Sequence, residues 1–549
     1  MTLATDPPAA GARPDEADAP DRSPAAATSE VPRRPRAWRW AAAFAAAYLV
    51  LGVVWAVANP PAAAPDEADH LIKAIGMGRL DIGDDYDEPL PAAPPLQRRN
   101  LSISRVVDVP GDISPDGYTC FAFQPDVTAD CQPDGSVATT DTVESITPVG
   151  AYPPFVYPAM GAAARLADSP EGAFLLARLV ALVTASAAIF VGAWFLVREI
   201  GRWALLGAFV ALSPMAVFAA ASVTTSGLEI ASGFAVGAIA TVCIREPAAV
   251  LRSRTHYTLA GVGTALVLSR QMGAVTLAVL LAVTVACCWR QVWQAVREHR
   301  PSLLVCIGAI GTSVVGVALW ERAYDHPTDT GSPLDLSALD PFLNGSQEIV
   351  LSSIGRFGWL DTPLPIWAWS AWLAVGVVLC GMGLALGDRR QRLVLGFGLL
   401  AAAGVTFASY SSVFFPVGAG SQGRHLLPLL AFCPTFAGVL VVERLRSVGL
   451  ADAARALFVA VAGVVGIVQF VSVWTNSRRY AVGLSGPLWF AGESQWAPAG
   501  GWAPWLVLAA LGAGGLAAVA LLSRPPAAVA AVAASAPAPP TTTTDPGET

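Results

Sequence analysis

Four ionisable side chains follow directly after the first long apolar stretch of the chain. They are Asp66, Glu67, Asp69 and His70, within the segment PDEADH at 65–70. Carboxylates just above a membrane surface can remove a proton from an acceptor hydroxyl or hold a divalent cation through hard oxygen ligands. At helical spacing Asp66 faces Asp69 and His70, whereas Glu67 points elsewhere. The alternative is an acidic first turn of a helix, which the helix dipole favours whatever the function.

An arginine and a histidine stand where a later polar loop enters an apolar span. Arg424 and His425 lie in the segment SQGRHLLP at 421–428. A guanidinium at headgroup level suits a lipid phosphate, because it can pair with phosphate bidentately. An ordinary interfacial anchor would occupy the same position. An earlier polar loop ends in RFGWLDTPLP at 356–365, and its Arg356 and Asp361 are further candidates for substrate binding.

Aromatic residues and prolines crowd the segment YPPFVYP at 152–158. Such a segment is typical of the aromatic belt at a membrane interface. It could also wall a carbohydrate or isoprenoid groove, so Tyr152 is a candidate substrate-binding residue. Arg178 and Arg270 occur at membrane depth, where an arginine needs a partner or an aqueous cavity. Arg178 alone could instead extend its side chain to the surface.

The composition determines which kind of fold must position these residues. Charged residues make up 14% of the 549 residues, against about 25% in soluble domains. The hydrophobic set makes up 54%, and the mean hydropathy is +0.53. The apolar runs are continuous over about 20 residues, which excludes the alternating pattern of a transmembrane β-barrel. We therefore predict an all-α integral membrane protein.

About twelve apolar segments approach the length of roughly 20 residues that a helix needs to cross a bilayer. The fifth is shorter, and it is separated from the sixth by Arg270 and Gln271. These twelve segments form a polytopic domain over 37–523. The Pro- and Ala-rich ends, 1–36 and 524–549, are predicted to be disordered. The predicted spans are 40–58, 172–197, 203–222, 227–244, 257–269, 272–289, 302–320, 366–386, 393–413, 425–442, 456–474 and 503–523.

Arginines gather in alternate loops of this arrangement, for example at 198–202, 389–392 and 444–455. Basic loops remain on the cytoplasmic side of a membrane. All of them fall on one side only if the chain turns back at Arg270. The pattern therefore predicts a plasma-membrane protein with both termini in the cytoplasm. The large polar loops 59–171 and 321–365 then lie outside, and we expect a protein that concentrates its polar sequence on one side to work there.

Of the eight cysteines, two share the first outer loop, Cys120 and Cys131. An exported compartment permits oxidation, so we expect a disulfide between them. Two free loop thiols are the alternative. The other six cysteines lie in or at the ends of apolar spans.

Five motifs occur in a fixed order along the chain. They are PDEADH, YPPFVYP, SPMAVFAAASV at 213–223, FGWLDTPLP and QGRHLLPLL. In this combination the chain resembles, over about residues 40–475, the bacterial polytopic proteins grouped as domain of unknown function 2142. That family is similar in layout to the membrane glycosyltransferases of the GT-C fold, which have many spans and a carboxylate in the first outer loop.

The resemblance implies transfer of a sugar, with inversion, from a polyprenyl-phosphate donor to a cell-envelope acceptor on the outer face. Asp66 would be the general base, and Glu67 would assist it or bind Mg²⁺ or Mn²⁺. Arg424 would hold the donor phosphate. The partners would be the lipid bilayer, this donor and a glycan or lipid-linked acceptor, with no nucleic acid.

Two other functions compete with the transferase. A carrier or flippase for lipid-linked saccharides needs charged residues inside the bundle and often has internal repeats. The sequence has no obvious repeat between its halves, and its charges cluster at the outer rim. A non-catalytic scaffold of the cell envelope would tolerate the loss of Asp66, whereas an enzyme would not.

Overall fold

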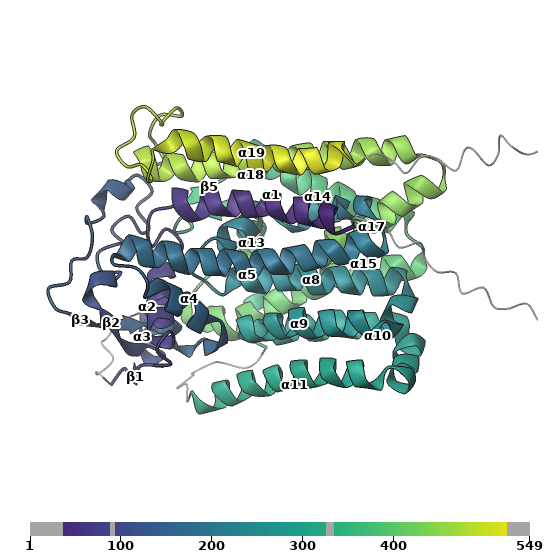
Figure 1. Ribbon diagram of the computed structural model, residues 1–549, viewed down its shortest axis with the longest axis horizontal. Helices are drawn as coiled ribbons and strands as arrows, with labels where there is room; N and C mark the ends of the chain where they lie inside the picture. Colours follow the sequence, from purple (N-terminus) through teal and green to yellow (C-terminus); the bar gives the residue numbers. More distant parts are fainter. Residues whose placement is uncertain (1–36, 88–93, 325–333, 524–549) are drawn as a thin grey trace, which may run out of the picture. The chain divides into compact units, whose positions relative to one another are not determined.

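Long apolar helices run alongside one another through most of the chain (Figure 1). The computed structural model describes residues 37–87, 94–324 and 334–523, and the predicted tails 1–36 and 524–549 lie outside the described residues. Within the described part, ten helices are long and apolar enough to cross a membrane. They are α1 (Ala37–Ala58), α5 (Pro170–Glu199), α8 (Ser226–Arg245), α10 (Gln271–Glu298), α11 (Arg300–Ala323), α14 (Ile366–Leu386), α15 (Arg389–Ser409), α16 (Leu427–Leu430) with α17 (Phe432–Ser447), α18 (Ala451–Val482) and α19 (Trp502–Leu521).

The prediction of a polytopic bundle is therefore confirmed, with ten candidate spans among the described residues where about twelve were predicted. The third predicted span, 203–222, is two helices, α6 (Leu205–Ala211) and α7 (Pro214–Ala220), bent by 80°. Counting that pair as one span gives up to eleven. The fifth, 257–269, belongs to α9 (Ser253–Ser269), which has 17 residues, the lower limit for crossing a bilayer.

The break between α6 and α7 has a local cause. Pro214 cannot donate a backbone hydrogen bond to the preceding turn, and the Ser213 side chain accepts one from Ala216 N at 3.3 Å to begin α7. The carbonyl of Leu212 is left without a helical partner, and Gln469 Nε2 of α18 donates to it at 3.1 Å. A neighbouring span thus supplies the hydrogen bond that the Leu212 carbonyl lacks within its own helix. The bend turns α7 toward residues 59–66, the segment after α1.

The contacts between helices define which of them are neighbours in the bundle. α1 lies between α5 and α19, and α18 packs on α19 (Figure 1). α9 packs against α8, α10 and α11. A Cβ on Gly273 of α10 would lie 1.9 Å from the carbonyl oxygen of Leu266 in α9, so the chain does turn back at Arg270. All described helices and strands belong to one compact unit.

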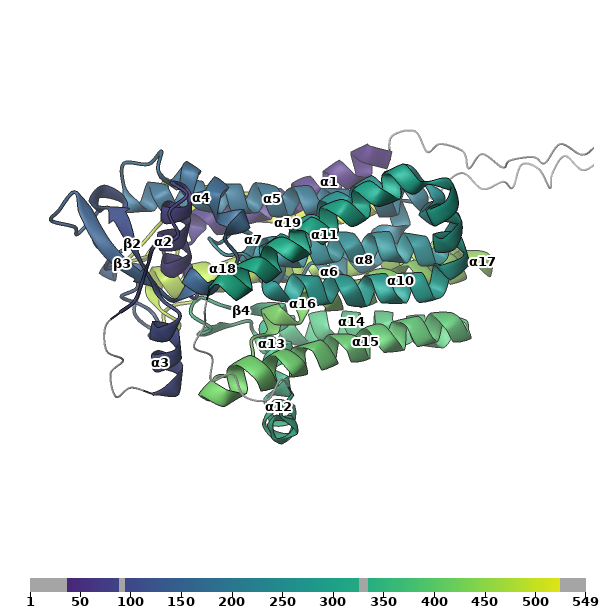
Figure 2. The same ribbon diagram turned by 90° about the horizontal axis from the view of Figure 1, so that it is seen from below.

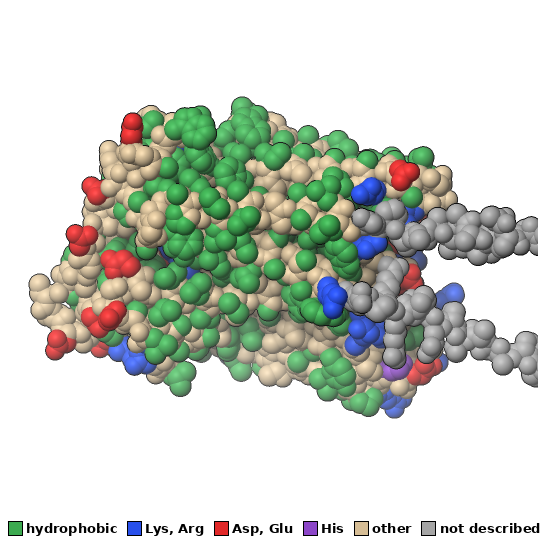
Figure 3. Space-filling view, turned by 45° about the horizontal axis from the view of Figure 1, so that its top comes forward, with side chains coloured by type: hydrophobic (Ala, Val, Ile, Leu, Met, Phe, Trp, Pro, Cys, Tyr) green, Lys and Arg blue, Asp and Glu red, His purple; other side chains and the backbone are tan. Residues whose placement is uncertain are grey.

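The two ends of the helix bundle differ in charge. One end, here called the arginine end, brings together Trp40, Arg202, Trp203, Arg446 and Ser523. The other, the loop end, carries the strands and the segment after α1. On the face in Figure 3, Asp and Glu gather at the loop end, hydrophobic side chains cover the middle, and most Lys and Arg lie toward the arginine end. This distribution suits a protein embedded in a bilayer.

The loop end holds a small sheet that the all-α prediction did not include. Its strands, β1 (Asp84–Asp85), β2 (Arg105–Pro110) and β3 (Thr142–Thr147), are antiparallel in the order β1-β2-β3, with Val106 opposite Ile146. A second pair, β4 (Arg356–Phe357) and β5 (Thr362–Pro363), forms the hairpin of the FGWLDTPLP motif. Short helices complete this end: α2 (Glu67–Met77), α3 (Pro95–Ser102) and α4 (Tyr157–Ala164), whereas α12 (Leu339–Asn344) and α13 (Ser346–Gly355) lie nearer the middle of the bundle's length (Figure 2).

Helix α2 begins with the acidic motif and is covered by protein. Leu71 and Ile75 are fully buried, and α2 packs on α4 and the β2–β3 hairpin. The approach to α4 is close, since a Cβ on Gly161 would lie 1.6 Å from the carbonyl oxygen of Ala74.

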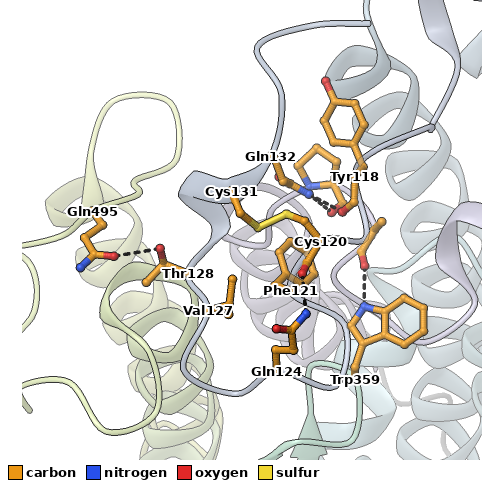
Figure 4. Close-up of a disulfide and its surroundings, with 12 residues drawn as sticks. Tyr118, Cys120, Phe121, Gln124, Val127, Thr128, Cys131, Gln132, Trp359 and Gln495 are labelled. Atoms are coloured by element: carbon orange, nitrogen blue, oxygen red, sulfur yellow. Dashed lines mark hydrogen bonds between the residues drawn. A yellow bond between two sulfur atoms is a disulfide. The ribbon is translucent and has the colours of Figure 1, made fainter. Parts of the chain in front are cut away.

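The expected disulfide is present. Cys120 and Cys131 are bonded and close a short loop that is shown in Figure 4. The buried guanidinium of Arg479, at the end of α18, holds this loop by donating to the carbonyls of Phe121, Gln124 and Val127 at 2.6–3.0 Å.

The orientation of the bundle in the membrane stays a prediction, and labelling can test it. We expect a membrane-impermeant thiol reagent to modify Ser136→Cys at the loop end in intact cells. Gln391→Cys, at the start of α15, should react only after the cells are opened. Both variants belong in a background without the six free cysteines. Modification of Gln391→Cys in intact cells would contradict the orientation.

Candidate functional site

A buried ion pair organises the segment that carries the acidic motif. Glu67 is fully buried, and Arg178 of α5 is 3% exposed. Arg178 donates to both Glu67 oxygens, at 2.8 and 2.7 Å. It also donates to the carbonyls of Ala56, Asn59 and Pro60 at 2.7–3.0 Å. One guanidinium therefore fixes the end of α1 and the start of α2 together.

The remaining capacity of Glu67 is used by backbone amides. Val223 N donates to Oε1 at 2.9 Å and Ala64 N to Oε2 at 3.2 Å. A carboxylate offers about four acceptor positions, and here all four are occupied. These contacts occupy the acceptor positions of Glu67 and connect it to α5 and to residue 223, and a catalytic role for it stays a prediction. They also show that Arg178 does not extend to the surface, because a buried partner holds it.

Asp66 stands next to this pair but faces the solvent. Its backbone has φ +61°, in the left-handed region that Asp and Asn tolerate better than most residues. Its side chain is 46% exposed, and Oδ2 lies 3.6 Å from Nη2 of Arg424. The fold therefore brings together the first-loop acid and the arginine of the QGRHLLPLL motif, which are far apart in the sequence.

Arg424 reaches this position through the preceding glycine. Gly423 N donates to Ser352 Oγ of α13 at 2.9 Å. A Cβ on Gly423 would lie 2.0 Å from Ser353 N, so a larger residue cannot make this approach. The side chain of Arg424 is 12% exposed.

Tyr152 contacts both His70 and a second arginine of the site, Arg270. His70 Nδ1 and the Tyr157 hydroxyl are hydrogen-bonded at 2.7 Å, and the His70 ring meets Tyr152 edge to face. Arg270 donates to the Tyr152 hydroxyl at 3.1 Å and lies over its ring. The aromatic segment therefore contacts the turn at Arg270, and a role of Tyr152 in substrate binding stays a prediction.

Burial and neighbouring charges set the protonation of three side chains near Asp66, namely Asp69, His70 and His425. Burial, and then the charge of Asp66, raise the pKa of Asp69 to about 7. Burial lowers the pKa of His70 and His425 well below the usual range, and nearby arginines add to the effect. Both imidazoles are therefore neutral at neutral pH. The ring of His425 stacks on Phe414 with centroids 5.2 Å apart.

Two buried charged residues near the site, Glu229 and Lys73, were not predicted from the sequence. Glu229, in the first turn of α8, is 3% exposed, and the charges of Arg270 and Arg424 act on it. An acid just inside an apolar span was the signal for it. Lys73, the chain's single lysine, is buried and donates to the carbonyls of Val149, Gly150 and Tyr152. It ties α2 to the aromatic segment.

A pocket opens beside Asp66. It is lined by Ala64 and Pro65, by α7, by the end of α13 and by the segment 422–424. Arg356 lines this pocket and pairs with Glu348. Asp361 does not reach it, because its Oδ2 accepts from Arg479 Nη2 at 2.8 Å. The structure thus gives Asp361 a structural contact where substrate binding was predicted.

The predicted metal ligands do not fit a resident ion. Every acceptor position of Glu67 is already used, as described above. Among the described residues, no group of three or more His, Cys, Asp or Glu side chains is placed to hold an ion. Of the two predicted ligands, these contacts leave Asp66 accessible. A requirement for Mg²⁺ or Mn²⁺ stays a prediction.

Comparison with known proteins gives a family over most of the chain. The family model described as "Predicted membrane protein (DUF2142)" matches residues 49–433. The chain belongs to the DUF2142 family. The match includes Asp66, Arg270 and Arg424, so the cluster lies inside the DUF2142 region. No curated protein and no solved structure matches the chain.

Proposed function

We propose that this DUF2142 protein transfers a sugar from a polyprenyl-phosphate donor to a glycan or lipid-linked acceptor, on the outer face of the plasma membrane. One observation carries the proposal: Asp66 Oδ2 lies 3.6 Å from Nη2 of Arg424, a residue that lines a small pocket. A transferase of this kind needs a base beside the acceptor hydroxyl and a cation beside the departing phosphate. The two side chains match those needs in chemistry and in position.

The reaction follows as one displacement. The acceptor hydroxyl oxygen attacks the anomeric carbon while its proton passes to the Asp66 carboxylate. The bond between the anomeric carbon and the phosphate oxygen breaks, and its electron pair leaves with the lipid phosphate. Arg424 stabilises the charge that develops there. Attack opposite to the leaving group inverts the anomeric carbon.

The neighbouring residues supply binding rather than proton transfer. Neutral His70 and the Tyr152 hydroxyl can hydrogen-bond sugar hydroxyls, and Arg270 fixes Tyr152. His425 follows Arg424 in the chain, and we assign it, like His70 and Tyr152, to substrate binding. Glu67 and Arg178 hold Asp66 in place without touching substrate.

Replacing Arg424 by lysine tests the phosphate role. Lysine keeps the charge but lacks the planar fork that pairs with phosphate. We expect Arg424→Lys to raise the donor concentration needed for half-maximal transfer by about tenfold or more. Membrane abundance should stay unchanged. The measurement is restoration of the envelope glycan in a deletion strain, with donor supply varied.

The matched control is Arg98→Lys on the exposed face of α3, which should have no effect. Full restoration by Arg424→Lys at low donor supply would contradict the phosphate role. A carrier would give a different result, since lipid-linked donor would then accumulate on the cytoplasmic side of the deletion strain. A scaffold would be indifferent to both substitutions.

A further inference from the structure

The backbone carbonyls of residues 61–63, shortly before the acidic motif, each accept a hydrogen bond from a distant side chain. Gln132 Nε2 donates to the first carbonyl at 2.8 Å, Trp359 Nε1 to the second at 3.0 Å, and the Tyr480 hydroxyl to the third at 2.8 Å. Arg178 holds the two carbonyls before them, as described above. Five consecutive carbonyls between α1 and α2 are therefore fixed by side chains rather than by a helix or a sheet.

This segment needs outside support because of its backbone conformation. Ala62 has φ +55° and Asp66 has φ +61°, in the left-handed region that disfavours alanine in particular. Such a conformation persists only where the surrounding contacts hold it, and it is typical of functional sites. Ala62 and Ala63 are fully buried, so water cannot easily replace a lost donor. Loss of one donor should therefore loosen the turn that carries Asp66.

The loop closed by the disulfide supports the first of these donors. Cys120 and Cys131 are bonded, and Gln132 follows directly in the chain. Besides Pro61, Gln132 Nε2 also donates to the carbonyl of Tyr118 at 2.7 Å, across the base of the loop (Figure 4). Because the disulfide keeps Tyr118 and Gln132 close together, it also fixes the donor that reaches Pro61.

The same loop packs against the second and third donors. Phe121 is fully buried, and its ring meets that of Tyr480 edge to face with centroids 5.0 Å apart. Phe123 meets Trp359 edge to face at 5.2 Å. Arg479 then joins the loop to the β4–β5 hairpin, since it donates to three loop carbonyls and to a carboxylate of the hairpin. The loop, the hairpin and the end of α18 thus form one support for the segment before the acidic motif.

We propose that the disulfide-closed loop is the positioning element of the proposed base. The positioning residues are Gln132, Trp359 and Tyr480, which do not touch substrate. They hold the turn before Asp66, so that its carboxylate stays beside Arg424. The inference rests on the proposed function and adds what keeps its base in place. It also gives a role to the FGWLDTPLP motif, whose tryptophan supplies one of the donors.

Hydrogen exchange of backbone amides tests this positioning without any activity measurement. The variants Tyr480→Phe and Trp359→Phe each remove one donor and keep an aromatic ring. In the purified full chain in lipid nanodiscs, mass spectrometry should show the amides of residues 62–70 exchanging about 3- to 10-fold faster, the effect of one lost hydrogen bond. Cys120→Ser with Cys131→Ser should accelerate exchange in this segment too, although it lies outside the loop.

The matched controls remove the same kinds of donor outside this segment. Tyr48→Phe deletes a buried hydroxyl that donates to the carbonyl of Phe209 at 3.3 Å. Trp203→Phe deletes a buried indole that donates to the carbonyl of Ser523 at 3.2 Å. Neither control should change exchange at 62–70. Unchanged exchange in the test variants, or equal acceleration in the controls, overturns the inference.

Glycan transfer separates this inference from the proposed function. Tyr480→Phe should lower the maximal rate of glycan restoration in the deletion strain by about 3- to 10-fold. It should leave the donor concentration for half-maximal transfer unchanged, in contrast to Arg424→Lys. Faster exchange with undiminished transfer would leave the positioning in place and overturn Asp66 as the base. A raised donor requirement would mean that Tyr480 acts on substrate, which would overturn its positioning role.

Discussion

Asp66→Asn should lower the rate of sugar transfer by about 10²- to 10⁴-fold, the usual contribution of a positioned base. Asparagine has the same shape and tolerates the left-handed backbone that Asp66 adopts at φ +61°. Alanine there would add backbone strain, so asparagine is the cleaner test. The measurement is the envelope glycan restored to a deletion strain, at equal membrane abundance of the variant.

The control for Asp66→Asn is Asp112→Asn, an exposed carboxylate on the same loop end. It should restore the glycan fully. Equal restoration by Asp66→Asn would show that this residue is no base and that the acidic motif serves only as a helix start.

Arg178→Gln should destabilise the protein by about 3–5 kcal/mol, because it leaves the Glu67 carboxylate buried without its cation. Five hydrogen bonds made by one guanidinium are lost at the same time. Glu67→Gln should destabilise in the same direction. The double variant Arg178→Met with Glu67→Leu should lose less than the sum of the single variants, since no buried charge is then left unpaired. The measurement is the thermal unfolding of purified protein in nanodiscs.

A partly exposed pair provides the comparison. Arg245 and Glu443 lie 2.7 Å apart with side chains 26% and 32% exposed. Arg245→Gln should cost no more than about 1 kcal/mol. If Arg178→Gln is as stable as Arg245→Gln, the pair does not hold the start of α2, and the position of Asp66 must have another cause.

Composition was enough to predict the membrane class and most of the helices. Apolar length decides whether a helix can cross a bilayer, and length is visible in one dimension. Ten of the predicted segments match membrane-length helices for that reason. The pattern could not show that α6 and α7 meet at 80°, because the break at Leu212 is stabilised by Gln469 from a distant span.

The candidate site at the loop end was likewise predictable from the sequence only in part. The residue types beside the spans were visible in the amino-acid sequence, and they implied a polar site and the disulfide of Cys120 and Cys131. Their burial and their partners became visible only in the folded chain. Glu67 and Asp66 are adjacent in the chain, yet one is buried under Arg178 and the other faces Arg424. A local pattern cannot separate them, because burial and charge pairing depend on helices contributed from far along the chain.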